Sequence, residues 1–223
     1  NKNLKHEDRI MVYDSIFLLD RLSATETVEG GQSITFGNEY AIYDKFNESE
    51  IFALNLATSL RDQENDKLPV NSTLSQKMSD IVGESVIKIN DTLKFDYTFA
   101  IDQSYKEFNS NEAGAEIDIG KTSFNVSYLQ EKNHIGNKEF IESGVNFELN
   151  ESNELAFSTK RNLLTSSAEF YNLSYNYIND CLKAGLVFRR EFYLDKDVAP
   201  DNTLMFTISI VPFANINSPN LQK

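Results

Sequence analysis

Residues Leu93 to Ile101 read LKFDYTFAI, and this stretch decides the fold class. Apolar side chains occupy every second position, and Lys94, Asp96 and Thr98 stand between them. Successive side chains of a β-strand point to opposite faces, so this alternation predicts a strand with one apolar, aromatic-rich face and one polar face.

The same period of two recurs along most of the chain. It is visible in the runs Ile34 to Ile42, Phe52 to Leu60, Phe124 to Tyr128, Val145 to Leu149, Tyr171 to Tyr177, Leu182 to Phe188 and Phe206 to Ile210. We expect about 11 to 12 strands of nearly membrane-spanning length, and therefore an all-β protein. A helical period does not persist anywhere, and Gln76 to Val82 is the one candidate for a helical turn.

The expected connections fall into two groups. Tight turns are predicted at Asn90-Asp91, Gly120-Lys121, Asn150 to Asn153 and Asn179-Asp180, whereas Asp62 to Ser79 and Tyr105 to Glu112 are longer links. Consecutive strands should therefore be antiparallel neighbours. Short turns at one rim and longer loops at the other are typical of an up-and-down transmembrane β-barrel.

Alternation also occurs in soluble β-sandwiches, which stay open as the alternative at this point. The long strands, the aromatic face and the polar opposite face favour the barrel, whose polar side chains would line a water-filled lumen. A sheet in lipid must close, because lipid offers its edges no hydrogen bonds. We therefore expect residues 1–223 to be a single domain that forms the C-terminal half of a larger barrel, with partner strands upstream.

Composition narrows the function. With 34 acidic and 21 basic residues the net charge is -13, which disfavours nucleic acid as a partner. The two histidines, His6 and His134, are far apart in the sequence and give no local support for a zinc site or a catalytic triad. We predict no enzyme activity, no metal and no cofactor.

Several motifs point to one family. Asp14 to Ser23 (DSIFLLDRLS) is followed by Val28 to Gly31 (VEGG) and Ile34 to Gly37 (ITFG). Further along come Ser79 to Gly83 (SDIVG), Asn179 to Leu182 (NDCL), Arg189-Arg190, Asp195 to Asp201, and Thr203 to Ile208 (TLMFTI). In this order they resemble the LptD family of lipopolysaccharide-assembly proteins, also called the organic solvent tolerance family.

The resemblance implies an integral protein of the outer membrane of a Gram-negative bacterium, surrounded by outer-membrane lipids. Its function would be to deliver lipopolysaccharide from the periplasm to the outer leaflet through the barrel lumen and a lateral gate, without catalysis. The implied partners are lipopolysaccharide, an LptE-like plug lipoprotein and a periplasmic LptA-like bridge reached through an upstream domain. A different outer-membrane barrel, a porin or a barrel enzyme, is the other alternative.

Particular residues take roles by the same resemblance. Cys181 would form a disulfide with the upstream domain, or otherwise be a free thiol. The gate strand would contain Thr203, Phe206, Ile208 and Ile210, with Pro212 just beyond it as a weakness in the seam or a simple strand terminator. The motif loop comprises Asp20, Arg21, Glu29, Gly30, Gly31, Gly37, Asp80 and Gly83.

Two of these assignments have an alternative interpretation without a functional role. Asp20 and Arg21 form a charge pair that fixes an inward loop, or a solvated pair on an exposed one. Gly30, Gly31 and Gly37 mark positions of positive φ or close approach, or ordinary turns.

Overall fold

The computed structural model describes residues 11–19, 21, 29–66, 68, 73–132, 137–192, 200–210, 214–217 and 221–222. Its regular structure is β apart from one short helix. The elements are α1 (Tyr13–Ile16), β1 (Ser33–Tyr43), β2 (Glu50–Arg61), β3 (Ile81–Asn90), β4 (Leu93–Ile101), β5 (Phe108–Ile119), β6 (Thr122–Glu131), β7 (Lys138–Asn150), β8 (Asn153–Asn162), β9 (Ser167–Ile178), β10 (Leu182–Glu191), β11 (Asp201–Ile210), β12 (Ala214–Asn217) and β13 (Leu221–Gln222).

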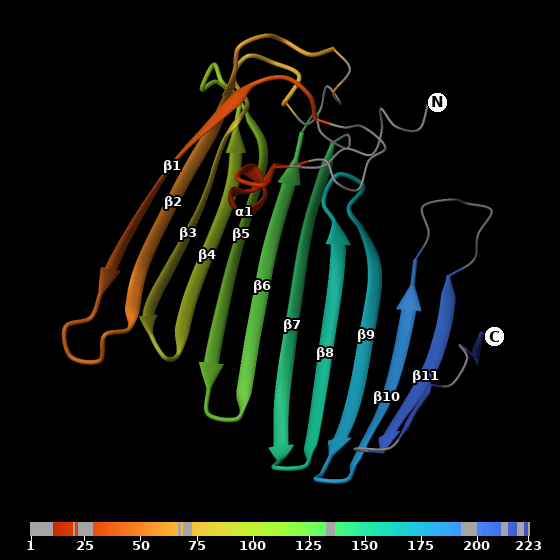
Figure 1. Ribbon diagram of the computed structural model, residues 1–223. Coiled ribbons are helices and arrows are strands. Elements are labelled where there is room, and N and C mark those ends of the chain that lie inside the picture. The colour runs from red at the N-terminus through yellow and green to blue at the C-terminus, as the bar shows by residue number, and fades with distance from the viewer. Residues whose placement is uncertain are drawn as a thin grey trace. The chain divides into compact units, whose positions relative to one another are not determined.

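The strands follow one another through a single sheet. From β1 to β12 the spatial order is the chain order, and β13 pairs with β11 (Figure 1). This confirms the predicted all-β, up-and-down antiparallel architecture with its eleven long strands. The sandwich alternative is wrong, because a sandwich requires two sheets packed face to face.

The chain divides into two compact units. The first contains residues 1–114 and 128–139, and the second contains residues 115–127 and 140–223. In the first unit β1 pairs with β2 from Ser33↔Arg61 onward, and β2 to β4 continue the antiparallel ladder. In the second unit the ladder runs continuously from β7 to β11.

Strands β1 to β4 of the first unit have two distinct faces. The apolar face carries aromatic and aliphatic side chains such as Phe36, Leu54 and Phe95, and Phe36 is 50% exposed. The polar face carries Glu39, Asn55 and Glu84, and Asn55 Nδ2 donates a hydrogen bond of 2.8 Å to Glu84 Oε1. Large exposed apolar side chains in ordered strands indicate a surface that meets lipid or another apolar phase.

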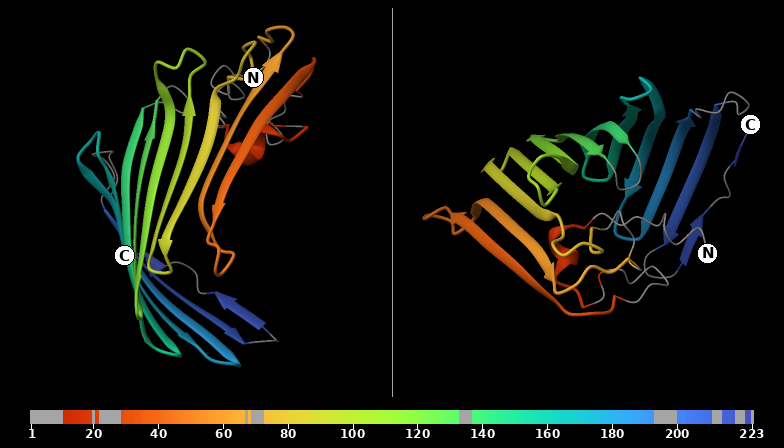
Figure 2. Two further views of the ribbon diagram at one scale, coloured as in Figure 1. Left: turned by 90° about the vertical axis from the view of Figure 1, so that its left-hand side faces the viewer. Right: turned by 90° about the horizontal axis from the view of Figure 1, so that it is seen from above.

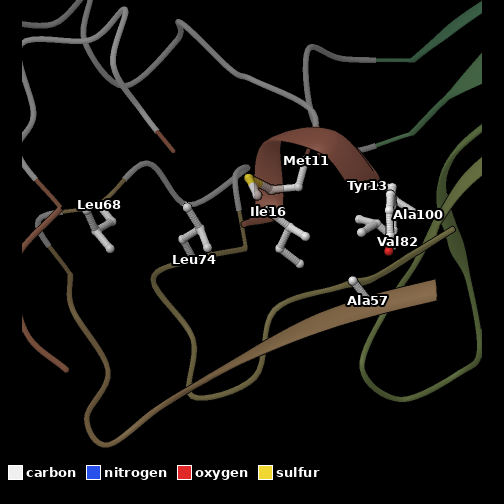
Figure 3. Close-up of a cluster of buried hydrophobic side chains, with 8 residues drawn as sticks. All are labelled: Met11, Tyr13, Ile16, Ala57, Leu68, Leu74, Val82 and Ala100. Atoms are coloured by element: carbon white, nitrogen blue, oxygen red, sulfur yellow. The ribbon is translucent and has the colours of Figure 1, made fainter. Parts of the chain in front are cut away.

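The buried hydrophobic cluster of the first unit lies on the polar face. There α1 packs against β2 and β3, and Ile16 is fully buried (Figures 2 and 3). Figure 3 shows the members of this cluster, which are Met11, Tyr13, Ile16, Ala57, Leu68, Leu74, Val82 and Ala100. The small side chains Ala57, Val82 and Ala100 leave room for the helix on strands that are otherwise polar on this side.

The second unit repeats the two-faced pattern. Phe157 of β8 pairs with Leu173 of β9, and Leu186 of β10 pairs with Phe206 of β11, all on its apolar face. Their neighbours in sequence, such as Asn172 and Ser174, point to the opposite, polar face. The predicted tight turns are present, and Gly120 has the positive φ, +62°, that its turn requires.

Two local predictions are wrong. Gln76 to Val82 contains no helical turn, since Met78 forms a β-bridge with Leu60 and Val82 belongs to β3. The link expected at Tyr105 to Glu112 is shorter, because β5 already begins at Phe108. Among the described residues, no helix is long and apolar enough to cross a membrane.

Candidate functional site

The residues before β1 fold back onto the polar face of the first unit. Tyr13 Oη donates a hydrogen bond of 2.8 Å to Glu39 Oε1 of β1, and the ring of Phe17 occupies the space beside Gly37 where a side chain would otherwise lie. Burial, reinforced by the Glu39 carboxylate, raises the pKa of Tyr13 to about 12. The tyrosine is therefore a neutral donor at physiological pH.

Beyond α1, Arg21 is fixed by a dense set of hydrogen bonds. Its Nε donates to Glu29 Oε2 at 2.9 Å, and its Nη2 donates to Glu29 Oε1 and to Ser33 Oγ, the latter at 2.8 Å. Its Nη1 donates to Ser59 Oγ at 2.6 Å and to Thr35 Oγ1 at 3.4 Å. All five N–H groups of the guanidinium are thus used, which is the full donor capacity of arginine.

A second arginine joins the same carboxylate. Arg61 of β2 donates from Nη1 to Glu29 Oε1 at 2.7 Å and from Nη2 to the carbonyl oxygen of Gly30. The side chains of Arg21, Arg61 and Glu29 are only 4%, 3% and 5% exposed. We call these three residues, with Ser33, Thr35 and Ser59, the anchor network.

The anchor network brings together residues that are distant in sequence. Arg21 and Glu29 come from the segment before β1, whereas Arg61 ends β2. The pairing Ser33↔Arg61 in the β1–β2 ladder places the end of β2 beside the segment that enters β1. A cavity of about 390 Å³ lies beside the network, and Phe17, Arg21, Glu29 and Arg61 contribute to its wall.

The glycines of the motif loop differ in their surroundings. Gly31 has φ of +94°, a conformation that favours glycine, and a Cβ there would lie 3.2 Å from Arg61 Nη2. Gly30 has open space around it. Gly83 lies on the apolar face, where a Cβ would lie 2.5 Å from the Phe99 ring, so the glycine makes room for that aromatic side chain.

Asp80 is buried at the end of the long link that precedes β3. It is 1% exposed, its Oδ2 accepts a hydrogen bond of 2.7 Å from Asn109 Nδ2, and its backbone N–H donates to Thr73 Oγ1 at 3.0 Å. Next to it, Ser79 exchanges hydrogen bonds with the backbone of Ser59. The Ser79 to Gly83 motif therefore ties this link to β2 and β5.

The structure also places the remaining predicted residues. Arg21 is buried rather than solvated, and its described carboxylate partner is Glu29, whereas Asp20 lies outside the described residues. Cys181 is exposed in the turn between β9 and β10. The gate residues Thr203, Phe206, Ile208 and Ile210 lie in β11, and Pro212 lies outside the described residues.

Sequence reasoning missed part of the site. Arg61, Ser59 and Asn109 were not singled out, because each becomes a partner only through the pairing of strands. The described part of the chain contains no group of His, Cys, Asp and Glu suited to hold a metal ion. The site is a buried, hydrogen-bonded attachment of the segment before β1 to the polar face of the first unit.

Comparison with known proteins gives one family match. A family model described as LptD, LPS transport system D, matches residues 8–153, which is more than half of the chain and includes the whole anchor network. No curated protein matches the chain.

Solved structures with a similar arrangement of strands include porins. Two mutants of the Rh. blastica porin each have a TM-score of 0.48 at 9% identity; one comparison covers 78% of this chain and 79% of that chain, and the other covers 82% and 81%. A triple mutant of the Rhodopseudomonas blastica porin has a TM-score of 0.43 at 10% identity, covering 85% of this chain and 88% of that chain.

Proposed function

Because the chain belongs to the LptD family of the lipopolysaccharide transport system, we propose that it delivers lipopolysaccharide from the periplasm to the outer leaflet of the outer membrane. In this proposal the strands form part of a closed barrel that spans the membrane. The apolar face meets the lipid, and the polar face lines the lumen. The family is one of transport proteins, and the chemistry required here is binding and release without bond cleavage.

The two-faced strands are the observation that supports this proposal most directly. Lipopolysaccharide has a polar, anionic headgroup and an apolar acyl region, so its path must offer different surfaces to the two parts. On β4, Asp96 and Thr98 belong to the polar face, while Phe95 and Tyr97 belong to the apolar one. Strands built in this way provide a hydrated route for the headgroup within an apolar membrane.

The anchor network contributes to the same function by shaping the lumen. It holds α1 and the residues around it against the polar face, where an unattached segment would be free to move across the route. Every N–H of Arg21 is satisfied within the network, so its guanidinium has no donor left for a passing lipid. Its proposed role is structural: it keeps an inward segment in one place.

Release of the lipid into the membrane is proposed to occur at β11. Along one edge β11 pairs continuously with β10, from Asp201↔Glu191 to Ile210↔Leu182. Along the other edge the described pairs belong to two short strands, β12 at residues 207–210 and β13 at residues 203–204. An edge covered by short strands separates more easily than a full ladder, which supports a lateral gate there.

The proposed partners follow from the family. They are an LptE-like plug lipoprotein inside the lumen, an LptA-like periplasmic bridge and an upstream domain bonded to Cys181. The position of Cys181 suits such a disulfide, because the thiol is exposed in a tight turn and the tight turns of outer-membrane barrels face the oxidising periplasm.

The transport proposal is tested by photocrosslinking at two neighbouring positions of β4. A photoreactive phenylalanine analogue replaces Thr98 on the polar face or Tyr97 on the apolar face of the intact protein in cells. We expect lipopolysaccharide to crosslink at position 98 only while upstream transport is running, and any crosslink at position 97 to be independent of transport. The proposal would be contradicted if crosslinking depended on transport equally at both positions, or if position 98 gave no crosslink.

A further inference from the structure

Two arginines interrupt the apolar face of the second unit. In the described strands of this unit, register and alternation place Arg161 of β8 and Arg190 of β10 on the same face as Phe157, Tyr171 and Leu186. No other charged side chain of those strands points to this face. Both arginines are exposed, and both lie near the ends of their strands. Arg161 precedes the connection 163–166 and Arg190 precedes the connection 192–200, and these two connections lie at the ends of the strands opposite to the tight turns.

These side chains lie in an aromatic setting. The guanidinium of Arg190 stacks over the ring of Phe192, 5.1 Å from its centroid, and Phe192 meets Tyr171 edge to face at 5.6 Å. Tyr171 in turn stacks on Phe157 at 6.4 Å. Arg161 Nη2 donates to the backbone oxygen of Ser166 at 3.2 Å. Among the described residues, neither arginine forms an ion pair with a carboxylate.

The neighbouring Arg189, on the polar face, does have a carboxylate partner. It precedes Arg190 and points to the polar face, where its Nε lies 2.6 Å from Glu191 Oε1 and its guanidinium stacks over Phe170 at 4.2 Å. The polar-face arginine therefore has its counter-ion within the protein. The described residues supply no such counter-ion to Arg161 or Arg190.

The depth of the two arginines in the bilayer determines which anionic groups can reach them. An arginine on the lipid-facing side of a barrel costs about 2 to 4 kcal/mol at the bilayer midplane but only about 0 to 1 kcal/mol near the interface. Aromatic residues mark that interface, and the longer connections of an outer-membrane barrel lie on its extracellular side. In the proposed barrel the two guanidiniums therefore lie at the level of the headgroups of the outer leaflet, where phosphate is an anionic group that arginine can bind through two parallel hydrogen bonds.

We propose that Arg161 and Arg190, with Tyr171 and Phe192, form a binding site on the outer, lipid-facing surface for the phosphate groups of lipopolysaccharide in the outer leaflet. The inference rests on the proposed placement of the chain in the outer membrane. It goes beyond transport through the lumen, because the site lies on the opposite face of the sheet and holds a lipid that is already in the membrane.

The test uses two positions on one strand and one face. The photoreactive analogue replaces either Tyr171, next to the arginines, or Tyr175, nearer the tight-turn end of β9, in the intact protein in cells. We expect lipopolysaccharide to crosslink at position 171 and not at 175. With Arg161→Gln and Arg190→Gln together, the crosslink at 171 should fall roughly fivefold, the size expected from the loss of two exposed charge pairs.

A matched control removes two positive charges from the polar face. Lys94→Gln with Lys183→Gln should leave the crosslink at position 171 unchanged. An undiminished crosslink in the double arginine variant would overturn the proposed site, as would an equal loss in the lysine control. Transport-dependent crosslinking at position 98, measured in the same cells, shows separately whether the proposed function holds.

Discussion

Among the described residues, Glu29 is the one carboxylate that contacts the two buried guanidiniums of the anchor network. Its two oxygens accept from Arg21 and Arg61 together, so one negative charge is shared between two positive ones. Removal of one member of a buried ion pair is costly because it leaves the partner charge without compensation. Loss of Glu29 should therefore destabilise the network more than loss of either arginine.

We predict that Glu29→Gln destabilises the docked segment more than Arg61→Gln. The first substitution leaves two buried cations beside a neutral amide and should cost about 3 to 5 kcal/mol. The second leaves the paired hydrogen bonds between Arg21 and Glu29 in place and should cost less. Hydrogen exchange of the Ser15 and Ile16 backbone N–H groups, both bonded to the Val12 carbonyl oxygen, measures the local opening free energy.

Glu151→Gln, in the exposed turn between β7 and β8, is the matched control and should leave this exchange unchanged. The prediction is wrong if Arg61→Gln opens the segment as readily as Glu29→Gln does.

The sequence alone indicated Arg21 and Glu29 but not Arg61. The first two lie in a recognisable motif, and their separation is short. Arg61 reaches Glu29 only because Ser33 pairs with Arg61 in the ladder, and alternation predicts strands without fixing which residues face each other. The prediction of an inward charge pair named Asp20 as the partner of Arg21, and that residue lies outside the described part of the chain.

At the scale of elements, α1 exists because of what it packs against. A helix of four residues has no stability of its own, since the initiation of a helix is unfavourable and short helices gain few hydrogen bonds. Burial of Ile16 and the hydrogen bond from Tyr13 to Glu39 provide the stabilisation. No sequence period reveals so short a helix, which explains why the predicted helical turn was placed elsewhere.

The docking of α1 should depend on pH through Tyr13. The folded-state pKa of about 12 is above the ordinary value of 10.0, so the contribution of Tyr13 to docking is fully present below pH 10 and is lost as the pH rises towards 12. Ultraviolet titration of the intact protein, minus that of Tyr13→Phe, should show a tyrosine that ionises near pH 12. A difference curve centred near pH 10 would rule out the buried hydrogen bond.

A strand could be predicted from the sequence where its polar and apolar residues alternate. The long strands follow from runs such as Leu93 to Ile101, where the polar and apolar faces differ clearly. The start of β5 was missed because residues 108–112, FNSNE, carry one apolar side chain and resemble a loop. Their strand conformation comes from tertiary contacts, among them the hydrogen bond between Asn109 and the buried Asp80.

At the scale of the whole molecule, the proposed barrel and disulfide predict a characteristic behaviour on gels. The intact protein should migrate differently in SDS before and after boiling, because a closed barrel resists SDS until it is heated. Reductant should cause a second shift that is absent in Cys181→Ser. An unboiled sample that migrates like the boiled one would contradict the closed barrel, and a shift by reductant that persists in Cys181→Ser would contradict the proposed disulfide.

The order of the strands has a consequence for how the protein folds. From β1 to β12 each strand pairs with its neighbours in the sequence, so most contacts are local and hairpins can be added one after another at low contact order. The anchor network does not follow this rule, because Arg61 reaches its carboxylate only after the β1–β2 hairpin has formed. Docking of the segment before β1 is therefore expected to be a late step, completed on strands that are already paired.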